Sequence, residues 1–167
     1  MSQTDENLKE AFAGESQANR KYLAFAKKAD AQDFSQVARL FRAAADAETV
    51  HAHNHLQVMD GIKSTLENLK VAAEGEAAEF EKMYPGFIEQ AEEDGNENAR
   101  ASFDYANQVE QIHHEMYNAA IEAVQKGEDL PPVDMYVCQG CGNTVEEEAP
   151  ETCPICGAPK SMFKKID

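Results

Sequence analysis

The sequence predicts an all-α four-helix bundle followed by a small domain that a metal ion holds together. Three observations lead to this fold class: a long helix-forming region with one proline, helical stripes of apolar residues, and two cysteine pairs near the carboxyl end. Up to about Gly127 the chain is rich in Ala, Glu, Gln, Lys and Leu, which favour helices. Beyond that residue, glycines and prolines replace large apolar side chains.

Four long helices are expected in the first region. Asp33 and Gly61 are plausible boundaries of the second helix, and Ser64 with Glu67 has the spacing of a capping box at the start of the third. Pro85 should kink or interrupt the third helix, because it lacks the backbone N–H that a helix interior needs. The predicted helices cover approximately residues 5–31, 34–59, 65–93 and 96–126. Long helices with short connections favour an antiparallel bundle.

The change in composition divides the chain into two domains and a linker. The bundle is predicted over residues 1–127 and the small domain over residues 134–167, with a proline-containing linker over residues 128–133. A domain of roughly 34 residues seldom folds on a hydrophobic core alone and usually needs a disulfide or a metal.

Charge and hydropathy exclude several classes of partner. Fifteen basic and 31 acidic residues give a formal net charge of −16, which argues against nucleic acid and anionic membranes as partners. No apolar run approaches the ~18 residues that suggest a membrane span. The first residues are polar and acidic, unlike a secretory signal peptide, so a cytoplasmic protein is expected.

The predicted core face of each helix carries acidic residues near its middle. Burying an unpaired carboxylate costs several kcal/mol, and no lysine or arginine lies in these stripes to compensate. Two divalent cations would supply the missing charge. Any single acid at the edge of a stripe could instead face water. The five acids in question are Glu15, Glu48, Glu76, Glu79 and Glu110.

Two Glu-x-x-His pairs strengthen the prediction of a metal site. The i,i+3 spacing of Glu48 with His51, and of Glu110 with His113, brings an oxygen and a nitrogen ligand onto one helical face. Either pair alone could be structural. The dinuclear carboxylate pattern adds a glutamate from each of the other two helices. Mixed carboxylate and imidazole ligands suit iron or manganese better than zinc or calcium. The remaining candidate ligands are Glu15, Glu76 and Glu79.

All four cysteines lie in two Cys-x-x-Cys-Gly segments, with 11 residues between Cys141 and Cys153. In such a turn, backbone N–H groups point at the sulfur atoms, and the glycine can adopt the positive φ that the turn requires. Four thiolates would enclose one tetrahedral ion, and the spacing leaves open whether this is iron or a purely structural zinc. The predicted ligands are Cys138, Cys141, Cys153 and Cys156.

Taken together, these residues resemble the rubrerythrin family over almost the whole chain. The carboxyl-terminal segment 136–166, with its Cys-Pro-x-Cys-Gly-Ala-Pro motif, is similar to the family's rubredoxin domain. The segment 75–79 also contains the additional glutamate that distinguishes the family from simpler di-iron bundles. The four helices resemble the family's motifs at residues 15–22, 48–55, 75–79 with 83–85, and 110–113 with Tyr117.

The resemblance implies a fold and an activity. The fold would be a ferritin-like di-iron bundle with a carboxyl-terminal rubredoxin-like domain that holds one iron, or zinc as isolated, in its Cys₄ site. Family members reduce hydrogen peroxide to water and thereby protect against oxidative stress. Their electrons come from NAD(P)H through a separate reductase and often a separate rubredoxin. They form homodimers in which the Cys₄ centre approaches the di-iron site of the other subunit.

The resemblance also implies roles for the bundle ligands. Glu48 and Glu110 would bridge the two iron ions. Glu15 would hold one ion, and Glu76 with His113 would hold the other.

Four further residues receive roles from the same resemblance. Glu79 and His51 would exchange at the first iron as the redox state changes. Tyr22 and Tyr84 would form hydrogen bonds that orient the carboxylates.

Two other classes of protein compete with this interpretation. A ferritin-like ferroxidase shares the bundle but needs no Cys₄ domain. A non-enzymatic interaction protein could carry a zinc ribbon as its binding module and a structural bundle. The acids on the predicted core faces argue against this class.

Overall fold

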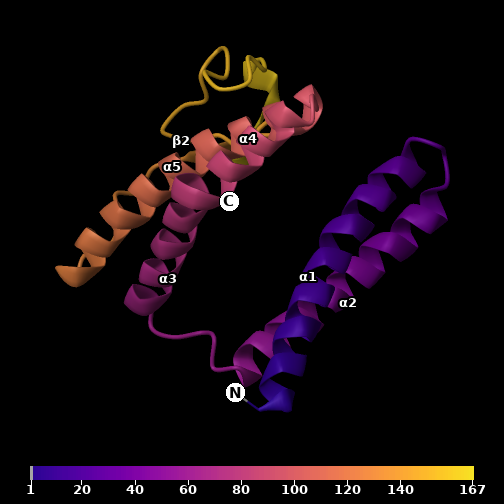
Figure 1. Ribbon diagram of the computed structural model, residues 1–167, viewed down its shortest axis with the longest axis horizontal. Helices are drawn as coiled ribbons and strands as arrows, with labels where there is room; N and C mark the ends of the chain where they lie inside the picture. Colours follow the sequence, from indigo (N-terminus) through magenta and orange to yellow (C-terminus); the bar gives the residue numbers. More distant parts are fainter. Residues whose placement is uncertain (1) are drawn as a thin grey trace. The chain divides into compact units, whose positions relative to one another are not determined.

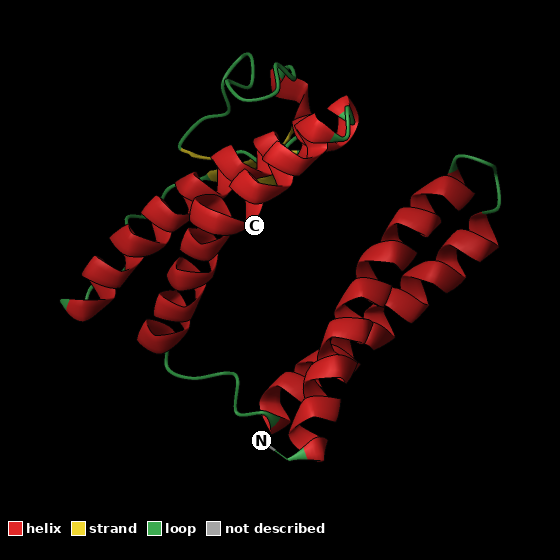
Figure 2. Ribbon diagram, in the orientation of Figure 1, coloured by secondary structure: helices red, strands yellow, loops and turns green. Residues whose placement is uncertain are grey.

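The computed structural model describes residues 2–167. Helices cover most of this range, and strands occur only in its carboxyl-terminal part (Figure 2). The chain divides into two packing units, with the boundary between Lys63 and Ser64. Among the described residues, every helix is too short or too polar to cross a lipid bilayer.

The first unit is a pair of long helices, α1 (Gln3–Asp30) and α2 (Ser35–Val58), which run side by side (Figure 1). At the start of α1, Ser2 and Asp5 form a capping box that the sequence analysis did not predict. Asp33 does not cap α2 as expected. It adopts a positive φ of 62° in the turn between the helices, and Phe34 precedes α2 without a side-chain cap.

Small residues form the contact between α1 and α2. Ala38, Ala45 and Ala52 are buried on α2 at intervals of seven residues, and Asn19 and Ala26 repeat the interval on α1. This spacing is typical of helices that pack at a shallow angle, and alanine lets their backbones approach closely. The sequence predicts a different apolar stripe on this helix, which includes Val37, Ala44 and His51, each one position before one of these alanines.

The second unit begins with α3 (Thr65–Ala78), a five-residue π-helical segment η1 (Glu79–Met83) and α4 (Tyr84–Glu93). The capping box of Ser64 and Glu67 is present, so this prediction is confirmed. The predicted interruption of the third helix is also confirmed. Pro85 lies in the first turn of α4, where its missing N–H is tolerated.

Helix α5 (Glu97–Gln125) packs against both α3 and α4. The Asn96 side chain accepts a hydrogen bond of 3.1 Å from the Ala99 N–H at its start. Gly127 follows the helix with a φ of 77°, a conformation that few other residues adopt readily.

The carboxyl-terminal part of the second unit is a three-stranded antiparallel sheet of order β2-β1-β3. Its strands are β1 (Met135–Cys138), β2 (Thr144–Glu146) and β3 (Phe163–Ile166), and the 3₁₀ turn η2 (Lys160–Met162) precedes β3. The most deeply buried of its larger side chains are Cys138, Cys153 and Asn143 rather than large apolar residues. Strand β2 also contacts α5, which brings this sheet to the helices of its own unit.

Candidate metal centres

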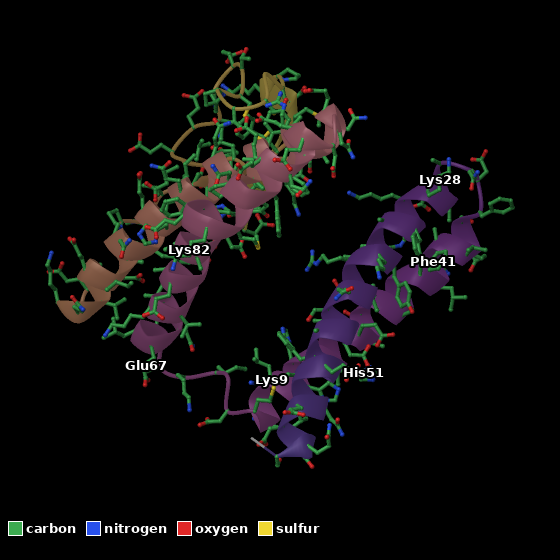
Figure 3. The ribbon with its side chains drawn as sticks, in the orientation of Figure 1. Lys9, Lys28, Phe41, His51, Glu67 and Lys82 are labelled. Carbon is green, nitrogen blue, oxygen red and sulfur yellow. The ribbon has the colours of Figure 1, made fainter. Side chains whose placement is uncertain are left out.

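In the first unit, a cluster of metal-ligand type joins α1 to α2. Its members are Glu15, Glu48 and His51, whose ligand atoms all lie within 4.8 Å of one another. The His51 Nδ1 atom is 2.8 Å from Glu48 Oε2 and 3.9 Å from Glu15 Oε1. The His51 side chain, on α2 (Figure 3), is half exposed.

In the second unit, Glu76 from α3 joins Glu110 and His113 from α5 in a cluster of the same composition. The His113 Nδ1 atom is 2.8 Å from Glu110 Oε2 and 3.9 Å from Glu76 Oε1. The two clusters therefore repeat one geometry. Each contains one isolated glutamate and one Glu-x-x-His pair, whose histidine presents Nδ1 to the carboxylates.

The distances fit two ligands of one ion. Nitrogen and oxygen ligands that each lie about 2.1 Å from an ion at a right angle are about 3 Å apart. The separation of 2.8 Å between His113 Nδ1 and Glu110 Oε2 is close to that value. The same holds for His51 Nδ1 and Glu48 Oε2.

The acids of the second unit carry a charge that a cation would relieve. Burial raises the pKa of Glu76, and the neighbouring Glu110 raises it further, against the opposing effect of His113. Burial and then Glu110 also raise the pKa of Glu79, the first residue of η1. The pKa of Tyr84 is raised by burial and by the negative charges of Glu79, Glu110 and Glu76.

Tyr22 contacts aromatic rings in the first unit. Its ring centroid is 6.3 Å from that of Phe25 and 6.2 Å from that of Phe41. Its role in orienting a carboxylate stays a prediction.

Three residues of these regions were not assigned a role from the sequence. Buried Asn19 donates hydrogen bonds of 2.6 Å to the Ala45 carbonyl and 2.8 Å to Thr49 Oγ1, which ties α1 to α2 one turn from Glu15. In the sequence, the only indication of this role is that Asn19 is a polar residue four positions after Glu15.

His114 links α5 to α3. Its Nδ1 lies 2.8 Å from the Ala73 carbonyl oxygen, its Nε2 lies 2.9 Å from Asn118 Nδ2, and its ring packs 5.5 Å from Phe80. Both ring nitrogens are therefore occupied, and the residue is structural.

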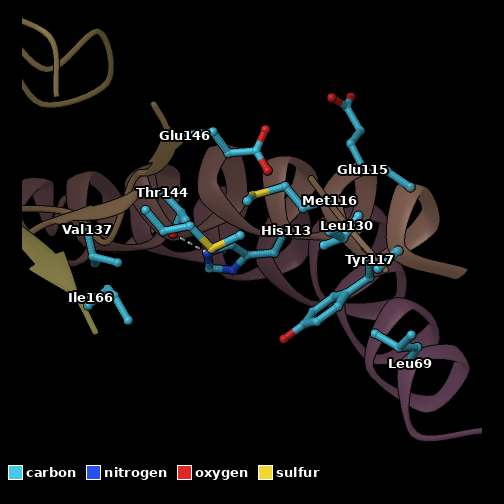
Figure 4. Close-up of a pocket in the computed structure, with 13 residues that line it drawn as sticks. Leu69, His113, Glu115, Met116, Tyr117, Leu130, Val137, Thr144, Glu146 and Ile166 are labelled. Atoms are coloured by element: carbon cyan, nitrogen blue, oxygen red, sulfur yellow. Dashed lines mark hydrogen bonds between the residues drawn. The ribbon is translucent and has the colours of Figure 1, made fainter. Parts of the chain in front are cut away.

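The third missed residue is Thr144 on β2. Its Oγ1 atom lies 2.9 Å from Nε2 of His113 (Figure 4), which is 31 positions away in the sequence. No local pattern signals a contact over such a separation.

The four cysteines form one cluster with free thiols. The Sγ atoms of Cys138 and Cys156 are 3.7 Å apart, and those of Cys141 and Cys153 are 3.6 Å apart. Four sulfur atoms that each lie about 2.3 Å from a tetrahedral ion are about 3.8 Å apart, so the cluster has the dimensions of a Cys₄ metal site.

The local environment shifts the pKa values of these thiols in different directions. Burial raises the pKa of Cys141, and hydrogen bonds with neighbouring thiols add to the effect. Burial also opposes ionisation of Cys153, but the backbone N–H groups of Cys156 and Ile155 outweigh it and lower the pKa to about 7. Four thiols in such close contact can all ionise only when a cation takes the place of their protons.

Comparison with known families agrees with these sites. The rubrerythrin family model matches residues 6–121, and the model of the rubrerythrin rubredoxin-like domain matches residues 136–164. Both clusters of glutamate and histidine fall within the first match, and all four cysteines fall within the second.

Individual relatives extend the similarity over almost the whole chain. Nigerythrin of Nitratidesulfovibrio vulgaris is 39% identical over 175 residues, which cover 96% of this chain and 85% of nigerythrin. Rubrerythrin-2 of Clostridium acetobutylicum is 32% identical, with coverage of 96% and 95%. The solved structure of fully reduced nigerythrin aligns with a TM-score of 0.57 at 37% identity, covering 99% of this chain and 88% of that one. The chain therefore belongs to the rubrerythrin family, with a helical ferritin-like domain that has a di-iron site and a rubredoxin-like domain that has a Cys₄ iron site.

Proposed function

We propose that this protein is a peroxidase that reduces hydrogen peroxide to two molecules of water with two electrons and two protons. The electrons would come from NAD(P)H through a separate reductase or rubredoxin, and would pass through the Cys₄ centre to the di-iron site. The observation that carries the proposal is the presence in one chain of two matched Glu–Glu–His clusters and a Cys₄ cluster. A pair of iron ions, when bound, supplies both electrons that cleavage of one peroxide bond requires.

The proposed ligand set of the di-iron site is the one that the family resemblance implies. Glu48 and Glu110 would serve as the bridging carboxylates. Glu15 would complete the ligands of one ion, and Glu76 with His113 would complete those of the other. The catalytic set therefore consists of these five residues together with His51 and Glu79.

His51 and Glu79 are proposed to exchange at the first ion with the redox state. A carboxylate favours the oxidised ion pair because it adds negative charge, and a neutral imidazole favours the reduced pair.

Tyr22 and Tyr84 are proposed to orient carboxylates. Because the pKa of Tyr84 is raised by burial and by the acids around it, its hydroxyl keeps its proton at neutral pH. The hydroxyl would therefore be available to donate a hydrogen bond to one of those acids.

The proposed assembly is a cytoplasmic homodimer, with the Cys₄ centre of one subunit near the di-iron site of the other. A reducing compartment keeps cysteine thiols available as metal ligands. The proposed domain limits are 1–127 for the bundle, 128–133 for the linker and 134–167 for the rubredoxin-like domain.

Iron-loaded full-length protein tests the proposal. The protein is reduced anaerobically, and its consumption of hydrogen peroxide is compared with its consumption of dioxygen in the presence of added Fe(II). A peroxidase should consume about one peroxide per di-iron site in a single turnover. Catalytic oxidation of added Fe(II) by dioxygen, with slow reaction toward peroxide, would favour a ferroxidase and would overturn the proposal.

A further inference from the structure

The imidazole of His113 lies between the bundle and the Cys₄ domain of the same unit. Its Nδ1 atom faces Glu110 and Glu76, whereas its Nε2 atom lies 2.9 Å from Thr144 Oγ1 (Figure 4). A residue of the rubredoxin-like domain thus contacts a candidate iron ligand directly.

The Thr144 hydroxyl has a second partner, the Gly142 carbonyl oxygen at 3.2 Å, which can only accept a hydrogen bond. When the Thr144 proton is directed at this carbonyl, Oγ1 offers a lone pair to His113 Nε2. A neutral imidazole that binds a metal through Nδ1 carries its proton on Nε2. In the metal-bound ring, His113 Nε2 would therefore donate to Thr144 Oγ1.

The Gly142 carbonyl that meets Thr144 lies in the first cysteine turn. Gly142 directly follows Cys141 and has a φ of 89°, a conformation that favours glycine. Its N–H donates to the Cys138 carbonyl oxygen at 2.8 Å, which fixes the peptide directly before the one whose carbonyl meets Thr144.

The cluster of the first unit lacks such a contact. His51 repeats the Nδ1 geometry of His113, but within its own unit its Nε2 atom has no hydrogen-bond partner among the described residues. The side-chain exposure is 53% for His51 and 28% for His113. The two histidines are therefore equivalent toward the carboxylates and differ in what holds the far side of the ring.

We propose that Thr144 is a positioning residue for His113: by accepting the Nε2 proton, it holds the ring with Nδ1 directed at the carboxylates and makes His113 the permanent histidine ligand. This inference rests on the proposed function, in which His113 binds iron and His51 exchanges. Hydrogen bonds to the far nitrogen of a metal-ligating histidine typically change metal affinity by about 10–100-fold.

Substitutions of Thr144 in the full-length protein test this role. Thr144→Val keeps the shape of the side chain but removes the acceptor, whereas Thr144→Ser keeps the acceptor. Thr152→Val is a matched control, because Thr152 is an exposed threonine of the same domain. Iron release to a chelator is followed, with the visible absorption of the Cys₄ iron as a separate signal. We expect Thr144→Val to release one of its two bundle irons about tenfold faster or more. Thr144→Ser and Thr152→Val should release iron as the wild type does.

A second measurement includes a test on the wild-type protein, which does not depend on how well the variants fold. In zinc-substituted wild-type protein, which is diamagnetic, the His113 Nε2 proton should give a resonance protected from exchange with water. The same resonance should persist in Thr144→Ser and disappear in Thr144→Val. If iron-loaded Thr144→Val also loses the Cys₄ absorption, its small domain is disrupted and the variant is not informative. The wild-type resonance alone then tests the role of Thr144.

The outcomes separate this inference from the proposed function. Wild-type protein that binds iron only at the four cysteines would overturn the ligand assignment itself. If the wild type binds three irons and Thr144→Val retains them equally well, only the role of Thr144 is wrong. An unprotected Nε2 proton in the wild type would also overturn that role.

Discussion

Glu76 and Glu79 show, at the scale of single residues, why the bundle needs a cation. Burial raises the pKa of both carboxyl groups, and the charge of Glu110 adds to the effect. Without a metal, the folded state holds these protons more tightly than the unfolded chain does. This difference is a free-energy cost of ionising the folded protein, and bound iron removes it.

The sign of the resulting pH dependence follows from linkage. Between the ordinary pKa of 4.5 and the raised pKa, the folded state binds more protons than the unfolded state. The free energy of unfolding of the metal-free protein therefore falls as pH rises through this window. Iron should restore stability most strongly at neutral pH.

We predict that metal-free full-length protein has a lower Tm than iron-loaded protein at pH 7. The deficit should be smaller at pH 5. Glu76→Gln with Glu79→Gln should raise the Tm of the metal-free protein at pH 7 by a few degrees, since about 1 kcal/mol corresponds to about 2–4 °C in a protein of this size. Thermal unfolding followed by circular dichroism measures both effects.

The net charge of −16 also destabilises the folded state as pH rises. Glu81→Gln controls for this contribution, because Glu81 is an exposed acid of the same segment η1. If Glu81→Gln stabilises the metal-free protein as much as the double variant does, the local effect of Glu76 and Glu79 is absent.

At the scale of secondary-structure elements, the π-helical segment η1 connects α3 to α4 and carries Glu79 at its first position. Such segments occur mostly as short insertions in α-helices and often at functional sites. Pro85 accounts for the local break, because it cannot donate the hydrogen bond that a continuous α-helix would require. An extra residue in the turn changes the direction in which the preceding side chains point, which is compatible with the proposed exchange of Glu79 at the metal.

We predict that Glu79→Ala impairs turnover more than metal binding. Glu79 is additional to the six ligands of the two Glu–Glu–His clusters, so both bundle irons should still bind. Sustained peroxide reduction should fall by on the order of tenfold or more, as for other losses of groups that tune a metal site. Metal analysis and steady-state assays with an electron donor test the two parts separately.

Glu81→Ala, in the same segment, should keep both iron content and turnover. Full peroxidase activity in Glu79→Ala would show that the proposed exchange with His51 is wrong.

At the scale of the whole molecule, the two kinds of metal centre are proposed to divide the reaction between them. Four thiolates fill the coordination of a tetrahedral ion and leave no position for peroxide. The proposed role of the Cys₄ centre is therefore to relay electrons. The proposed ligand exchange places the reaction of peroxide at the carboxylate and histidine clusters.

We predict that replacing Cys141 and Cys156 by Ser separates these roles. The variant should lose the Cys₄ iron and the order of the domain around it, because its most deeply buried larger side chains are cysteines and Asn143 rather than large apolar residues. Pre-reduced variant should still consume about one peroxide per di-iron site. Sustained turnover with NAD(P)H and a reductase should collapse.

Unchanged sustained turnover in this variant would mean that the Cys₄ domain is a structural or docking element. Loss of the single turnover would mean that the two centres are not chemically separable. Ser substitution of Thr152, an exposed residue of the same domain, should affect neither measurement.

Most features that depend on neighbouring residues were predicted from the sequence, although the capping box of Ser2 and Asp5 was missed and the cap expected at Asp33 was wrong. The capping box at Ser64 and the break at Pro85 involve groups a few positions apart, and so do the two cysteine turns. Helical spacing likewise brought each Glu-x-x-His pair onto one face. The chemistry of these features is contained in short segments, and short segments hold few alternative conformations.

Contacts between distant segments were decided only by the tertiary structure. Which face of α2 would meet α1 was not predictable, because an apolar stripe and a ridge of alanines lie one position apart and both satisfy the helical period. The contact of His113 with Thr144 was also invisible, because it depends on how the small sheet packs on α5. Sequence thus determined the kinds of ligand and their local spacing, whereas packing determined which distant side chain holds a ligand in place, because that choice depends on the path of the whole chain between them.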